Sequence, residues 1–143
     1  MKNITAAFLF LLLSNATYAQ VKFNLGYEET THVYTLSIVP ETTWEMPKNM
    51  VSSAQIVLRI DAGSEFTPGI TSLVDGLVWA DNAYVEHPDG DPEHSFVCIS
   101  LVNGPTSLIK MIAGEEVPLF SFVNAAGGCA GAVTLLANDD PAV

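Results

Sequence analysis

The chain has 143 residues, a length that favours a single domain. Its formal net charge is −11, from 16 acidic and 5 basic residues, which argues against binding to nucleic acids or to anionic membranes. Hydrophobic residues make up 49% of the chain, which excludes a disordered segment and predicts a folded core. Most of the carboxylates are expected on a solvated surface.

The N-terminus has the pattern of a secretory signal peptide. Lys2 gives a positive start, residues 4–13 form an apolar run, and residues 17–19 are a small-x-small cleavage site. The apolar run is too short to cross about 30 Å of hydrocarbon as an anchor. We therefore predict that residues 1–19 are removed. Residues 20–143 then form a domain that is secreted or lies on the cell surface, with no membrane insertion after cleavage.

Alternating apolar and polar residues predict strands in the first half of the mature chain. In chain order these strands are residues 21–27, 34–38, 56–60, 70–74 and 77–85. The first two are expected to pair as a hairpin, and Pro40 ends the second because proline cannot donate to a ladder. Asp75-Gly76 is the strongest hairpin signal in the chain, so the fourth and fifth strands are expected to pair as well.

The second half continues this pattern after an exposed loop, His87–His94, which contains no apolar residue. Further strands are expected at residues 96–102, 116–124 and 133–136, and an extended connection at residues 108–113. The chain stops soon after Pro141. We expect it to be the N-terminal piece of a longer polypeptide, with a natural end as the alternative.

The stretch 116–124 is the strand around which the others are organised. Phe120 and Phe122 fall on one face of it, and Leu119 and Val123 fall on the other. A strand that is apolar on both faces belongs in a core, with neighbours packed on it. About eight short strands, turn residues between them and no helical period predict an all-β fold. The expected architecture is a two-sheet jelly-roll sandwich of about eight to nine short strands.

Four segments of the chain together carry a resemblance to a known class of domain. They are the signal with residues 21–27, Trp79–Val85, Glu116–Phe122 with Gly128-Cys129, and Asn138–Pro141. In this combination they resemble the cohesin-like and carbohydrate-binding-module type of jelly-roll sandwich. The similarity is greatest to the N-terminal domains of secreted surface proteins of gliding, Bacteroidota-type bacteria. The resemblance implies downstream repeats and a sorting domain for the type IX secretion system, and it names no ligand.

We interpret the chain as a non-catalytic interaction or adhesion module of a bacterial cell-surface or extracellular protein. Its partner is then an extracellular protein or a polysaccharide. Two alternatives stay open, a carbohydrate-binding module and a structural spacer domain that presents downstream modules. We do not expect an enzyme, because the chain has no G-x-S-x-G elbow, no H-E-x-x-H and no phosphate-cradling glycine loop.

The acidic loop is one candidate site. Asp89, Asp91 and Glu93 alternate along it, and carboxylates gathered in a loop can supply the oxygen ligands that Ca²⁺ prefers. The spacing differs from that of an EF-hand loop, so a solvated turn is the alternative reading. The flanking His87 and His94 match no zinc framework and are interpreted as exposed loop residues. No other cofactor is expected.

Cys98 and Cys129 are the two cysteines of the chain. In an oxidising compartment they can form a disulfide, which would stabilise the fold by roughly 3–4 kcal/mol. Against this, Cys98 is expected in the middle of a strand and Cys129 after a glycine turn, and pairing needs Cα atoms within about 7 Å. Cys129 is alternatively expected to pair with a cysteine further along a longer chain.

Two aromatic side chains are candidates for stacking on a sugar ring. Trp79 shares its expected face with Leu77 and Val85, so it is assigned to the core. Tyr84 is expected on the opposite face, beside the acidic loop, and Trp44 lies in a polar connection. The predicted ligand-binding residues are therefore Tyr84 and Trp44.

Overall fold

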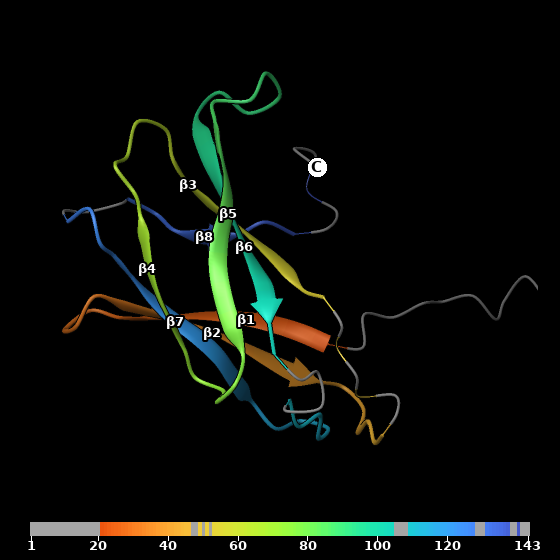
Figure 1. Ribbon diagram of the computed structural model, residues 1–143. Coiled ribbons are helices and arrows are strands. Elements are labelled where there is room, and N and C mark those ends of the chain that lie inside the picture. Colours follow the sequence, from red (N-terminus) through yellow and green to blue (C-terminus); the bar gives the residue numbers. More distant parts are fainter. Residues whose placement is uncertain are drawn as a thin grey trace, which may run out of the picture.

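The computed structural model describes most of the chain beyond the predicted signal peptide. The described residues are 21–46, 49, 51, 53–104, 109–127, 131–137 and 140. Within them the chain forms eight strands and no helix, and the strands make two antiparallel sheets of four (Figure 1). The predicted all-β sandwich is confirmed. No described helix is long and apolar enough to cross a membrane.

The first sheet contains strands from both ends of the domain. Its order is β1 (Val21–Glu28), β2 (Val33–Pro40), β7 (Val117–Asn124) and β4 (Pro68–Ser72). Strands β1 and β2 pair along their whole length as the predicted hairpin. Strand β7 lies in the middle of this sheet, between β2 and β4, as expected for a strand that is apolar on both faces.

The second sheet packs on the first. Its order is β5 (Val78–Glu86), β6 (His94–Asn103), β3 (Gln55–Asp61) and β8 (Thr134–Leu135). Strands β5 and β6 form a hairpin whose loop contains the acidic residues and extends beyond the rest of the sandwich (Figure 1).

The Asp75-Gly76 turn does not make a hairpin, and that prediction was wrong. The turn is tight, because the N–H of Leu77 donates to the carbonyl of Val74 at 3.1 Å and Gly76 has a φ of 83°. However, β4 pairs with β7 and β5 pairs with β6, so the chain passes here from one sheet to the other. A turn signal is local and does not say in which sheet the next strand finds its partner.

The core lies between the two sheets. Phe120 and Phe122 of β7 are buried there, as predicted, and Trp79 of β5 is also buried, with its ring centroid 4.9 Å from that of Phe120. The ladder between β2 and β7 is irregular at Leu36/Ser37, so Leu119 has no partner on β2, and it is buried with the core residues. Val123 is exposed.

Aromatic rings form a row across the inner face of the first sheet. The ring centroids of Tyr27 and Tyr34 are 4.5 Å apart, and Tyr34 stacks on Phe122 at 5.0 Å with an interplanar angle of 6°. Phe66, just before β4, meets Phe122 edge-on at 6.1 Å. Cross-strand aromatic pairs of this kind stabilise a sheet by about 0.2–1 kcal/mol each. The row connects the edge strand β1 with the opposite edge of the sheet.

Candidate functional site

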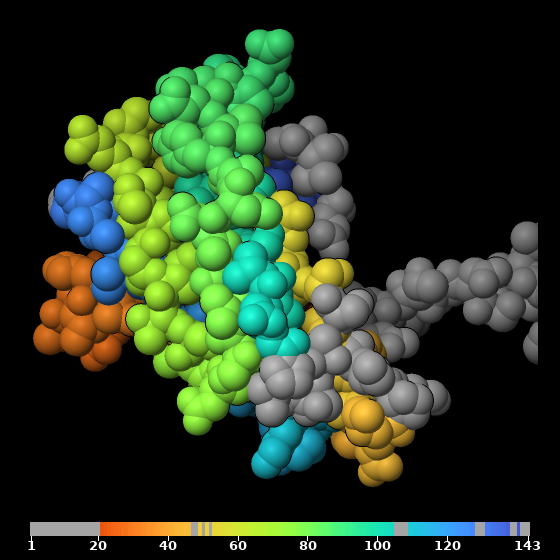
Figure 2. Space-filling model, in the orientation of Figure 1, coloured from red at the N-terminus to blue at the C-terminus, as the bar shows by residue number. Residues whose placement is uncertain are grey.

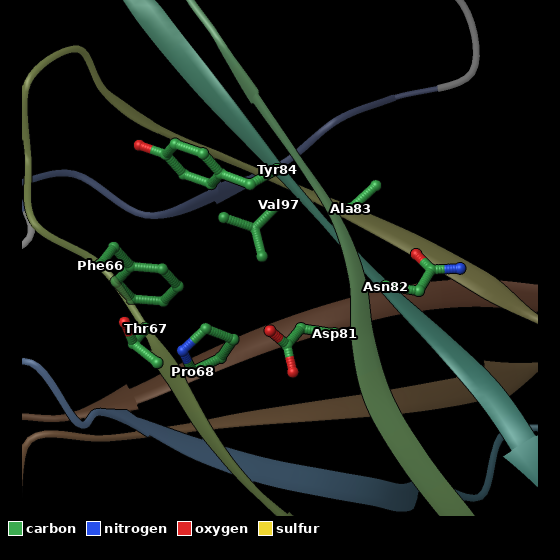
Figure 3. Close-up of a pocket in the computed structure, with 8 residues that line it drawn as sticks. All are labelled: Phe66, Thr67, Pro68, Asp81, Asn82, Ala83, Tyr84 and Val97. Carbon is green, nitrogen blue, oxygen red and sulfur yellow. The ribbon is translucent and has the colours of Figure 1, made fainter.

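A groove opens where the edge strand β5 faces β4 and the loop before it (Figures 2 and 3). It consists of two adjoining hollows of about 450 Å³ and 380 Å³ that share Phe66, Thr67 and Tyr84. The other lining residues are Gly63, Ser64, Glu65, Pro68, Asp81, Asn82, Ala83, Glu86, Val97 and Ala126. Ligand sites are concave and combine apolar surface with a few polar groups, as this groove does.

The wall on the β4 side is held by one side chain, Asn124 at the end of β7. Its Nδ2 donates to the carbonyl oxygens of Glu65 at 2.9 Å and Gly127 at 3.3 Å. Its Oδ1 accepts from the backbone N–H of Thr67 at 3.1 Å and of Ala126 at 3.2 Å. Two of these bonds lie on either side of Phe66. The amide therefore fixes the loop that presents Phe66 and Thr67 to the groove.

The wall on the β5 side is shaped by a β-bulge. Asp81 pairs with Ile99 and Ala83 with Cys98, so Asn82 is an extra residue without a partner opposite it. The extra residue shifts the alternation of side chains by one position. From Ala83 onward, the residues that simple alternation assigns to one face of β5 lie on the other.

The bulge places Tyr84 on the inner face of its sheet, opposite Val97. The predicted faces of this strand are therefore wrong beyond Asn82, because Tyr84 shares the inner face with Trp79, and Val85 lies outside. The assignment of Trp79 to the core is confirmed. Tyr84 is nevertheless 44% exposed, because β4 does not cover this end of β5. Its ring lies near Val97 and faces the loop of Phe66 across the hollow (Figure 3).

Several polar groups of the groove have no partner among the described residues. Within the described part of the chain, no hydrogen bond or ion pair reaches the hydroxyl of Tyr84 or the carboxylates of Glu65, Asp81 and Glu86. The lining as described contains three carboxylates and no lysine, arginine or histidine. The local potential is therefore negative and disfavours a negatively charged ligand.

Trp44, the second predicted ligand residue, does not line this groove. It makes an isolated bridge with Met111 and packs half-buried against the core. Its indole N–H donates to the Oγ1 of Thr42 at 2.6 Å. The structure thus places Tyr84 in the groove and Trp44 in a separate, packed environment.

The three acidic residues predicted to bind calcium differ in their surroundings. The Oδ1 of Asp91 is 2.6 Å from the Nδ1 of His94, and its Oδ2 is 3.6 Å from the Nε of Arg59. Asp89 and Glu93 are exposed. Among the described residues, no three metal-ligating side chains gather in a group that could hold an ion. Calcium binding by Asp89, Asp91 and Glu93 stays a prediction.

Arg59 also connects the acidic loop to the last described residue. Its guanidinium lies 2.5 Å from the Oδ2 of Asp140 and 5.8 Å from the ring centroid of Phe96. One cation on β3 therefore holds the loop residue Asp91 and the C-terminal segment against the outer face of the second sheet. The immediate role of Asp91 is to pair with Arg59 and His94.

The structure describes one of the two cysteines of the predicted disulfide. Cys98 lies half-buried on β6, opposite Val57 of β3 and Ala83 of β5. Cys129 lies outside the described residues. The disulfide stays a prediction.

Phe66 and Asp81 line the groove and Asn124 supports one of its walls, and the sequence did not point to any of them. A faint signal exists for Asn124, which stands at the end of a strong strand and before an Ala-Ala-Gly-Gly turn. Asparagine is frequent where a side chain must bond to turn backbone. No signal marks Phe66, because the residues that make it part of a site are distant in the sequence.

No family model, curated protein or solved structure matches the chain.

Proposed function

We propose that the protein is a non-catalytic binding module of an extracellular or cell-surface protein, and that its groove holds a saccharide. The observation that carries the proposal is the position of Tyr84. Its ring is turned by the bulge onto the inner face of an edge strand and is exposed, and among the described residues no group pairs with the nearby carboxylates of Asp81 and Glu86.

A sugar has two kinds of surface, and the groove offers a counterpart to each. The C–H face of a pyranose ring is apolar and can lie against an aromatic ring, which presents a flat apolar surface with a negative face. The hydroxyl groups at the rim of the sugar need acceptors and donors. The carboxylates of Asp81 and Glu86 accept hydrogen bonds, and the side chain of Asn82 and the hydroxyl of Thr67 can do both.

The charge of the groove narrows the class of saccharide. Uronic acids and sulfated sugars would be repelled by Glu65, Asp81 and Glu86, whereas neutral hexoses and amino sugars would not. The binding partner expected from this surface is therefore a neutral or amino polysaccharide. Binding would proceed by shape and hydrogen-bond complementarity alone.

Retention in gels that contain a polysaccharide tests this proposal. The protein is run through gels with neutral, amino and acidic polysaccharides, beside Tyr84→Ala and Val85→Ala. Val85 is the matched control, because it is also 44% exposed but lies on the outer face of the same strand. We expect retention by a neutral or amino polymer, a loss of roughly tenfold in affinity for Tyr84→Ala, and no loss for Val85→Ala.

Two results would contradict the proposal. Equal retention of the protein and Tyr84→Ala would place sugar binding elsewhere on the surface. Migration unaffected by any polymer would favour the other two interpretations, a module that binds a protein or a structural spacer.

A further inference from the structure

The edge strand β1 differs from the other three edges of the sandwich. Strand β4 begins with Pro68 and lies beside β5, and β5 is bulged at Asn82. Strand β8 has only two residues, Thr134–Leu135. Short length, proline and bulges are the features with which natural proteins block further strand pairing. Strand β1 has eight residues, contains no proline and pairs with β2 without a bulge. Among the described strands, no second partner covers its outer edge.

The inner face of β1 is also uncovered. Its inward-facing side chains include Phe23, which is 50% exposed, and Tyr27, which is 48% exposed. The corresponding edge of the second sheet is β8, which is too short to cover them. A long, regular strand that combines a free edge with exposed aromatic rings is a template for another strand.

We propose that β1 pairs with the β1 strand of a second copy of this protein, antiparallel about a two-fold axis at Leu25. In this register Phe23 lies opposite Tyr27 of the second copy, and Lys22 lies opposite Glu28 of the second copy. The symmetry repeats each pair, so two aromatic pairs and two ion pairs form. The two copies then share one continuous sheet of eight strands.

The strand sequence selects this register. Inward-facing residues stay opposite inward-facing residues only when the strand slides by two positions at a time. A slide of two in one direction places Lys22 opposite Gly26 of the second copy. A slide of two in the other direction moves Glu28 opposite Asn24 of the second copy. Both alternatives lose both ion pairs and both aromatic pairs, so the register about Leu25 is specified by charge as well as by shape.

The existing contacts of these side chains permit the pairing. Lys22 is bound to Glu41 at 3.0 Å, but this pair is well exposed and worth little, so Lys22 can pair with a second copy instead. The hydroxyl of Tyr27 lies 2.7 Å from the Nδ1 of His32, and its ring lies against Tyr34. The Tyr27 ring is thus already held in place, which reduces the entropy lost on association.

Sedimentation equilibrium with charge-reversed variants tests the proposal. The protein is measured from about 1 µM to about 1 mM at about 0.15 M salt, so that repulsion between two acidic copies is screened. We expect a monomer–dimer equilibrium in this range. Lys22→Glu and Glu28→Lys each place like charges opposite one another and should weaken the dimer about tenfold. The double variant Lys22→Glu/Glu28→Lys restores opposite charges and should recover the affinity to within about threefold.

Glu29→Lys is the matched control for Glu28→Lys, because it makes the same change of net charge in the turn that follows β1. It should dimerise at least as well as the unchanged protein. A monomer at every concentration would overturn the proposal, and so would a dimer that both single reversals leave unchanged. Amide hydrogen exchange of β1 adds a second readout. Slow exchange along β1 that is the same in dilute and concentrated samples would mean that another segment of the same chain covers the edge, and this too would overturn it.

Discussion

Tyr84 and Val85 are neighbours on β5 with the same exposed fraction, yet their surroundings differ. Tyr84 faces Val97 and Phe66 inside the groove, whereas Val85 pairs with Phe96 on the outer face of the sheet. Exposure alone therefore does not distinguish a binding residue from a surface residue. The distinction comes from the side of the strand and from the unpaired polar atoms nearby.

At the same scale, Asn124 is a positioning residue of the groove. Asn124→Ala removes four hydrogen bonds, two to the loop that carries Phe66 and Thr67 and two to the turn that follows β7. We expect a loss of about 1–3 kcal/mol in the free energy of unfolding, measured by urea denaturation. Retention by the polysaccharide should weaken as well, because the loop loses its fixed conformation.

Asn103→Ala provides the comparison for this prediction. Asn103 is exposed and accepts one local hydrogen bond, from the N–H of Gly104 at 2.8 Å. Its substitution should cost less than about 1 kcal/mol and leave retention unchanged. If both variants lost the same free energy of unfolding, the four hydrogen bonds of Asn124 would stabilise the protein no more than the single bond of Asn103, and the prediction would be wrong.

At the scale of elements, the bulge in β5 determines what the strand presents. Asn82 adds one residue, and the residues beyond it change faces as a result. The bulge also interrupts the ladder on an edge, which discourages pairing with another chain. One extra residue therefore both builds the groove and protects the edge.

Deletion of Asn82 tests its place in the ladder. Without the extra residue, Asp81 and Ala83 become neighbours, and the pairings Asp81–Ile99, Ala83–Cys98 and Tyr84–Val97 continue as a regular ladder with Tyr84 still on the inner face. We expect a folded protein that keeps polysaccharide retention. Nuclear Overhauser contacts between the Tyr84 ring and the methyl groups of Val97 should persist. Loss of those contacts would contradict the assignment of Asn82 as the extra residue of the ladder.

The sequence was informative about strands and less so about their partners. Alternation located the strands and the burial of Phe120 and Phe122, because period-two patterns are local and the core selects apolar side chains. The bulge at Asn82 has no such pattern, since an exposed polar residue fits a regular edge strand equally well. At Asp75-Gly76 the chain passes from one sheet to the other, and this depends on the distant strands β7 and β6, with which β4 and β5 pair. For the same reason the sequence did not reveal the roles of Phe66 and Asn124, because these residues are distant in the sequence and come close only after folding.

At the scale of the whole molecule, the sandwich depends on Phe122. It is 1% exposed and contacts the rings of Tyr34, Phe66 and Phe120. Phe122→Ala should lower the free energy of unfolding by about 3–5 kcal/mol, because it removes a buried ring and leaves a cavity. Urea denaturation measures the change.

The control is the neighbouring Val123→Ala, which alters an exposed side chain of the same strand and should lower the free energy of unfolding by less than about 1.5 kcal/mol. Equal losses would show that Phe122 is not central to the core.

The arrangement of the sheets also has a consequence in time. Leu36 of β2 is paired with Phe120 of β7, and Leu58 of β3 is paired with Leu135 of β8. Each sheet thus needs a strand that lies far along the described chain from its first strand, and neither can close before that strand has been made. Strand pairings between distant segments also form slowly. The first strands of each sheet therefore stay without these later partners until residues 117–135 have been synthesised.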